Sequence, residues 1–221
     1  MLENMAGALY SVQELNTIIT MLGCLCATVQ AGTGIYASVI KKKTALIKTN
    51  DIINRAHRGF GGFATTLYLL GLFAGLSGFI GAFLDLEGAP PLEYNESTFT
   101  IHVWMSFPIM VVILWKTYIS YFKKGSVFKY GRKLGIATFL AWAYTWITSA
   151  FSYYWRIEPP NLAKTTKPFP PPLFLLPIDL LWLQIIFPFI LGLLIFYPIY
   201  KKAERLEKNK EKKRKEQLNN N

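Results

Sequence analysis

The sequence predicts an all-α integral membrane protein, built as a five-transmembrane-helix bundle. Two observations carry this prediction: five long apolar runs, and connecting loops whose charge alternates in sign. Each run has about 20 or more mostly apolar residues, enough to cross a hydrocarbon core of about 30 Å as an α-helix. Helices are the expected spanning structure for such runs, because lipid offers no partner to an unpaired backbone group.

The expected helices cover residues 16–40, 60–84, 101–122, 134–155 and 175–200. The first run is too long for a signal peptide and no basic region precedes it, so we expect it to be a helix of the bundle. Cys24 and Cys26 both fall inside this run, and the chain has no other cysteine. Neither a disulfide framework nor a zinc site is therefore expected.

The second run is rich in glycine. Gly71 and Gly75 form a GxxxG pair, and Gly78 with Ala82 continues the stripe of small residues at helical spacing. Small residues let helix backbones approach closely in lipid. The pattern indicates close contact with another helix; the alternative is that the missing side chains leave room for a flat macrocycle.

The remaining segments complete the architecture. Lys116, in the third run, is expected to snorkel toward the cytosolic surface. The linker 156–172 contains six prolines, which predict an extended and semi-rigid segment before the fifth helix. Residues 201–221 alternate Lys, Arg and Glu and should continue the fifth helix as a basic cytosolic tail. The chain is thus divided into a transmembrane bundle, 1–200, and a tail, 201–221.

The charge of the loops predicts the orientation in the lipid bilayer. Segments 41–59 and 123–133 carry many Lys and Arg and one acid, Asp51. The other side holds the acidic residues Glu3, Glu14, Asp85, Glu87, Glu93 and Glu96. Lys and Arg concentrate in cytoplasmic loops, so we expect the N-terminus outside and the C-terminus in the cytoplasm. The net charge of +11 is then mainly a topology signal, and nucleic acid is not an expected partner.

The two histidines of the chain both lie at the entrance to an expected helix. His57 precedes the second run and His102 opens the third. Histidine near a span is a functional candidate, as a haem ligand or a proton carrier. The simpler interpretation is that His57 faces headgroups and that His102 belongs to the aromatic belt around Trp104. With an odd number of crossings the two imidazoles lie near opposite membrane faces, too far apart to ligate a single iron.

An Arg-x-x-His opening a Gly-rich helix, followed by a His opening the next helix, resembles the ascorbate-reducible and ferric-reductase-like transmembrane b-type cytochromes and related uncharacterised small membrane families. The resemblance covers residues 55–155. It implies a four-helix cytochrome-b-like core with two haem b groups, one near each face and each gripped by two histidines. If haem is present, Arg55, Arg58, Arg132 and Lys133 are placed to meet its propionates at the inner face, in charge-assisted contacts.

The chain departs from the family pattern at the partner histidines. Where the fourth run begins, residues 130–134 read Tyr-Gly-Arg-Lys-Leu, with Arg132 but no histidine, and the fifth run has none either. A haem held by one histidine would take a weaker sixth ligand, such as Met105, Met110 or water. The other possibilities are that a neighbouring subunit completes the site or that cofactor binding has been lost.

The sequence therefore predicts a small b-type-cytochrome-like protein that performs transmembrane electron transport between a donor or quinone and an acceptor or redox partner protein. His57 and His102 are the candidate iron ligands, in different sites. The resemblance makes it an electron carrier of the oxidoreductase type. The alternative is a haem-free accessory or assembly subunit of a membrane complex. A small-solute transporter is less well supported, because midplane charges and broken helices are missing.

Overall fold

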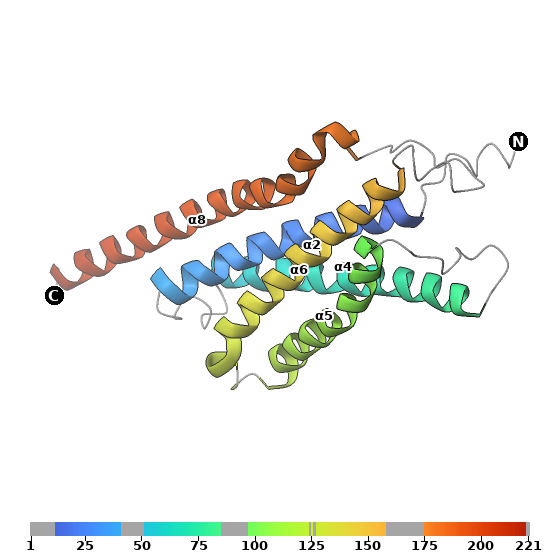
Figure 1. Ribbon diagram of the computed structural model, residues 1–221. Helices are drawn as coiled ribbons and strands as arrows, with labels where there is room; N and C mark the ends of the chain where they lie inside the picture. The colour runs from blue at the N-terminus through green and yellow to red at the C-terminus, as the bar shows by residue number, and fades with distance from the viewer. Residues whose placement is uncertain are drawn as a thin grey trace, which may run out of the picture.

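The computed structural model describes residues 12–40, 51–84, 97–123, 125, 127–157 and 175–219, which are helical and include no strand. α2 (Val12–Ile35) continues into a short π-helix, η1 (Tyr36–Ile40). α4 (Ile52–Phe83), α5 (Ser97–Phe122) and α6 (Val127–Ile157) follow. A 3-10 turn, η3 (Ile178–Leu180), leads into α8 (Leu181–Asn219). Five of these helices are long and apolar enough to span a membrane (Figure 1), which confirms the predicted all-α membrane architecture.

The largest difference from the expected boundaries is at the start of α4. This helix begins at Ile52 instead of residue 60, because Asp51 caps it: the Asp51 Oδ1 accepts a hydrogen bond from the Ile53 amide at 2.9 Å. An aspartate at this position satisfies an amide that the first helical turn leaves unpaired. Consequently Arg55, His57 and Arg58 belong to the first two turns of a helix instead of a loop.

The helix α2 lies at the centre of the bundle (Figure 1). α4 runs antiparallel to it, since Gln30 of α2 meets Gly61 and Ile19 meets Gly71. Glu14, expected among the loop acids, lies in α2 and is only 2% exposed. The interior along α2 is therefore partly polar, unlike the outer faces of α5 and α8, which expose large apolar side chains.

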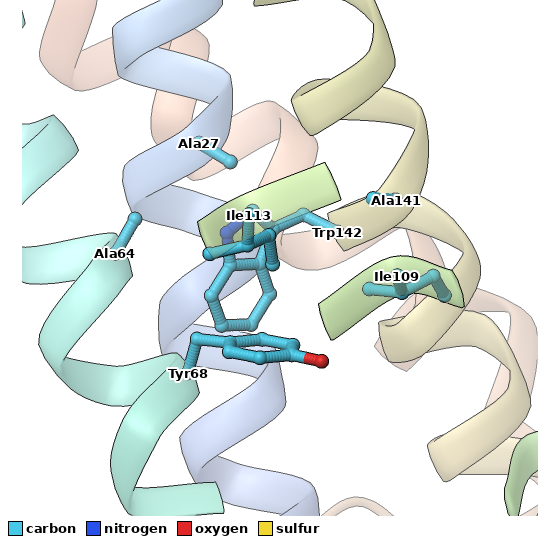
Figure 2. Packing of buried hydrophobic residues seen from close by; sticks show 7 residues of the cluster. All are labelled: Ala27, Ala64, Tyr68, Ile109, Ile113, Ala141 and Trp142. Atoms are coloured by element: carbon cyan, nitrogen blue, oxygen red, sulfur yellow. The ribbon is translucent and has the colours of Figure 1, made fainter. Parts of the chain in front are cut away.

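The other helices pack around α2 and against each other. α8 runs parallel to α2, with Gln184 near Met21 and Gly192 against Thr28. α6 covers a third side of α2 and also packs against α5. Figure 2 shows where α2, α4, α5 and α6 meet, with the Trp142 indole seated on the Tyr68 ring. The two ring centroids are 5.7 Å apart at an interplanar angle of 89°. This is the edge-to-face arrangement that aromatic pairs prefer.

The close approach of helices depends on glycines other than the predicted GxxxG pair. A Cβ on Gly71 would lie 3.1 Å from Asn16 Oδ1 of α2, whereas one on Gly75 would meet nothing within 4 Å. The GxxxG pair thus does not act as one contact surface. Among the α4 glycines whose surroundings the structure describes, Gly61 and Gly71 face α2; Gly78 and Ala82 of the predicted stripe lie outside those described side chains. At Gly23 of α2 a Cβ would lie 2.1 Å from the Trp142 ring, so α6 approaches α2 closely as well.

The tail predicted for residues 201–221 is continuous with the fifth span as far as the structure describes it, because α8 extends to Asn219. Beyond Ala203 its side chains are mostly exposed, and Lys208–Glu204 and Lys212–Glu216 form pairs one turn apart. Such exposed pairs contribute little to stability. Most of the proline-rich linker, residues 158–174, lies outside the described residues, as do the acidic residues of 85–96.

Candidate functional site

His57 is held against α2 through one ring nitrogen. Its Nδ1 lies 3.1 Å from the backbone oxygen of Gln30 and 3.0 Å from Thr33 Oγ1. A carbonyl oxygen only accepts hydrogen bonds, so Nδ1 carries the hydrogen and donates it. In the neutral ring the lone pair is then on Nε2. This nitrogen is the one that remains to bind a metal or to accept a proton.

Lys116 of α5 joins the same polar cluster, which we define as Gln30, Thr33, His57 and Lys116. Its Nζ donates to Gln30 Oε1 at 2.8 Å, and the ammonium is close enough to His57 to interact with it electrostatically. Lys116 thus has a hydrogen-bond partner inside the bundle, and its expected snorkelling toward the cytosolic surface stays a prediction. Helical side chains point toward the helix N-terminus. In α5 that direction leads away from the basic loop after Phe122 and toward Gln30.

The absence of a side chain at Gly61 leaves room for the side chain of Gln30. A Cβ at position 61 would lie 2.2 Å from Gln30 Nε2, so any larger residue there would displace the amide. Gln30 is 9% exposed, which makes it a buried polar group within a membrane-spanning helix. Its side chain extends from α2 across α4 to reach α5, and it thus connects three helices.

His102 is anchored in a similar way at a different place. Its Nδ1 lies 2.9 Å from Thr148 Oγ1 of α6. The Thr148 hydroxyl itself lies 2.8 Å from the Tyr144 carbonyl, which accepts its only hydrogen. The threonine oxygen therefore accepts from Nδ1–H of His102, and the ring presents Nε2 as its lone-pair nitrogen. Both histidines share this arrangement: Nδ1 is bound to a threonine hydroxyl that is fixed on its own helix.

The two histidines lie far apart along the bundle. Tyr68 of α4 donates to the Ser106 carbonyl of α5 at 3.2 Å, and this contact sets the register of the two antiparallel helices. His57 precedes Tyr68 by three turns, and His102 precedes Ser106 by one turn in the opposite direction. At 1.5 Å per residue the separation is about 20 Å along the axis. The residues around each ring also differ, so they form two sites.

The predicted cationic residues lie on the surface of the described helices. Arg55 and Arg58 are exposed on the first two turns of α4, beside His57, and Arg132 is exposed near the start of α6. Arg55 and Arg58 share one end of the bundle with Arg132, because α4 and α6 both begin there (Figure 1). The guanidinium groups are free to meet anionic groups at this end.

Met105 and Met110, the two methionines expected as alternative iron ligands, lie in different surroundings. Met105, one turn beyond His102, is 45% exposed, and Met110 packs against the cluster of Tyr68 and Trp142. The described residues contain no group of three or more His, Cys, Asp or Glu that could together hold a metal ion. The family pattern needs four histidines, two for each of two haems, whereas the chain has two in all. Each described site therefore offers one imidazole.

The partners of the histidines were not anticipated from the sequence. Gln30, Thr33 and Thr148 stand on helices far from His57 and His102 in the chain, and the spacing of residues within one helix says nothing about them. The sequence contained one indication that α2 holds such partners. α2 carries several polar residues in an apolar span, among them Thr28, Gln30 and Thr33, and polar residues in such spans face other helices.

Searches for related proteins leave the family open. No model of a protein family matches the chain, and no curated protein or solved structure matches it either. What the fold defines is the class: a multi-pass helical membrane protein with two anchored histidines.

Proposed function

We propose that the protein is a b-type-cytochrome-like electron carrier in which His57 and His102 each ligate a haem iron through Nε2. The observation that supports this most directly is the shared anchoring of the rings. Metal-ligating histidines almost always donate their other N–H to a fixed acceptor, which sets the tautomer and the ring orientation. Thr33 with the Gln30 carbonyl does this for His57, and Thr148 does it for His102.

In this proposal each residue has a defined task. The imidazoles would hold the iron through Nε2, and Met105, Met110 or water would supply a further, weaker ligand. Arg55, Arg58 and Arg132 meet propionates at the basic end, in charge-assisted hydrogen bonds. When bound, haem b supplies one-electron reduction and oxidation. A quinone in the membrane or a redox partner protein would deliver and remove the electrons.

The orientation belongs to the same proposal. The ends of α5 and α8 and the starts of α4 and α6 carry the basic residues and lie at one end of the bundle (Figure 1). We assign this end to the cytoplasm, because Lys and Arg are retained there during insertion. The N-terminus is then outside and the α8 tail in the cytoplasm.

A haem-free accessory or assembly subunit is the second candidate. It is favoured by the filling of the glycine positions that face other helices: Gln30 covers Gly61, Trp142 covers Gly23, and Phe196 covers Gly32. In this arrangement the glycines serve close packing of protein on protein, and space for a macrocycle at these points would require side-chain movement.

The two candidates differ in a visible spectrum. The full chain is expressed with added haem precursor, purified in detergent and measured as a reduced-minus-oxidised difference spectrum, with haem quantified per protein. We expect about two haems per chain, falling to about one in either His57→Ala or His102→Ala and to none in the double variant.

The matched control is Lys208→Ala, an exposed residue of the tail that should retain the full haem content. A colourless wild-type protein that is folded and monodisperse would refute the cytochrome proposal and leave the accessory subunit. Equal haem content in the wild type and in the double variant would refute the assigned ligands.

A further inference from the structure

The cluster around Lys116 contains a positive charge without a counter-ion. Lys116 lies in the α5 span and is half-buried, and its hydrogen-bond partner is the neutral amide of Gln30. No carboxylate of the described residues lies within ion-pair distance of Lys116. An ammonium removed from water without a negative partner is strongly unfavourable, and charged residues inside spans usually mark a ligand or an ion pathway.

The groups around this charge that can still form hydrogen bonds are N–H donors. An ammonium has three N–H groups, and Lys116 uses one of them on Gln30 Oε1. With its oxygen occupied, the Gln30 side chain still has the two N–H groups of Nε2. The missing component of the cluster is therefore an anionic acceptor.

The depth of the cluster indicates where that acceptor comes from. Gln30 lies against Gly61, one turn beyond Arg58 on α4, and Arg55 and Arg58 are both exposed at this end of the helix. The polar start of α4 and the basic residues after α5 place this level next to the headgroup region of one leaflet. Basic sites between transmembrane helices on that side bind anionic lipid headgroups.

We propose that Lys116 and Gln30, with Arg55 and Arg58 at the rim, bind the phosphate of an anionic lipid that enters between α2, α4 and α5. The phosphate oxygens accept from the free N–H groups of Lys116 and Gln30 and compensate the ammonium. This proposal is tested separately from the haem function, because the side chains of Lys116 and Gln30 have no role in haem binding and only the rim residues Arg55 and Arg58 are shared with the proposed propionate contacts; the measurement is made on protein with or without haem.

The test uses the full chain, delipidated in detergent and returned to nanodiscs. Discs of phosphatidylcholine alone are compared with discs containing phosphatidylglycerol, and the apparent Tm is recorded for each. We expect phosphatidylglycerol to raise the Tm of the wild type and Lys116→Met to lose this shift, while the tail variant Lys208→Met retains it. A Lys116→Met protein with the full wild-type shift would overturn the proposal.

Two further arms identify the source of the anion and guard against a variant that does not fold. Inorganic phosphate is added to phosphatidylcholine discs; a Tm shift as large as that with phosphatidylglycerol would overturn the lipid assignment in favour of a free anion. Native mass spectrometry of the wild type, equilibrated with equal amounts of both lipids, should show phosphatidylglycerol retained about fivefold over phosphatidylcholine. Equal retention would also overturn the proposal.

Discussion

At the residue scale, polar side chains within the apolar helices are held by specific partners. Thr33 and Thr148 each donate to a carbonyl of their own helix, and this leaves their oxygens to accept from a histidine of a neighbouring helix. The sequence predicts both histidines as candidates, since each opens a helix. It does not predict their partners, because the contacts depend on which faces of α2 and α6 turn inward.

The anchoring of His102 gives the first prediction. Thr148→Val keeps the shape of the side chain and removes the acceptor for Nδ1–H. Loss of an outer hydrogen bond to a metal-ligating histidine costs about tenfold or more in affinity. If His102 ligates haem as proposed, the variant should release haem about tenfold more readily to a competing haem-binding protein.

The control for this experiment is Thr117→Val. The Thr117 hydroxyl donates only to the Ile113 carbonyl of its own helix, 2.8 Å away, so its loss should leave haem affinity unchanged. Equal haem release from both valine variants would contradict the role assigned to Thr148.

Gly61 and Gly62 provide a second prediction from adjacent positions. Gly61→Ala displaces the Gln30 amide and breaks its bond to Lys116, whereas a Cβ at position 62 meets nothing within 4 Å. Leaving the buried Gln30 and Lys116 unpaired costs about 1–3 kcal/mol, while alanine in an exposed helical position gains up to about 1 kcal/mol over glycine. In detergent, the apparent Tm should fall for Gly61→Ala and stay level or rise for Gly62→Ala. The opposite order would refute the Gln30 contact.

At the element scale, hydropathy predicts the spans well and their ends poorly. Length and apolar content alone decide whether a run crosses a membrane, and for this reason the five helices were expected in the right order. The start of α4 was missed because the cap at Asp51 lets the polar residues Arg55, His57 and Arg58 join the helix. The faces of contact were missed as well: Gly71 faces α2 and Gly75 does not.

Next to Pro188 of α8, a side chain of α6 forms a hydrogen bond with the α8 backbone. Pro188 is fully buried and has no N–H, and a proline distorts the backbone hydrogen bonds of the preceding turn. The indole Nε1 of Trp146 donates to the Ile185 carbonyl in that turn at 2.9 Å. The carbonyl that loses its helical partner at Pro188 is that of Gln184, four residues earlier, so the indole bond to Ile185 supports the adjacent carbonyl of the same distorted turn.

This contact gives a third prediction, in the form of a double-mutant cycle. Trp146→Phe should destabilise the protein by about 1 kcal/mol, because the Ile185 carbonyl loses the buried indole hydrogen bond. In a Pro188→Ala background the turn is no longer distorted and the helix's own hydrogen bond to that carbonyl is stronger, so the same change should cost clearly less. Unfolding by denaturant in detergent measures both steps. Identical costs in the two backgrounds would show that the Trp146 bond and Pro188 are independent.

At the scale of the whole molecule, the bundle has a basic end and an end with few charges among the described residues. Lys123 and Arg132 lie at the first, and Asp179 lies at the second, just before α8 crosses. Consecutive long helices run in opposite directions, so α4 and α6 begin at the basic end, and His57 and His102, each near the start of one of two consecutive helices, lie toward opposite ends of the bundle. If the proposed electron transfer takes place, the bundle would serve it by holding one histidine site toward each of its two ends.

The last prediction concerns this polarity. Single cysteines replace Lys123 and Asp179, both exposed, in a background where Cys24→Ala and Cys26→Ala remove the native thiols. In intact cells, a membrane-impermeant maleimide should label the cysteine at position 179 and leave the one at 123 unlabelled until the membrane is permeabilised. The reverse pattern would invert the orientation, since charge retention on the cytoplasmic side is its physical basis. Labelling of both positions from the same side would show that α6, the described span between positions 123 and 179, does not cross the membrane, and the five-span topology would then be wrong.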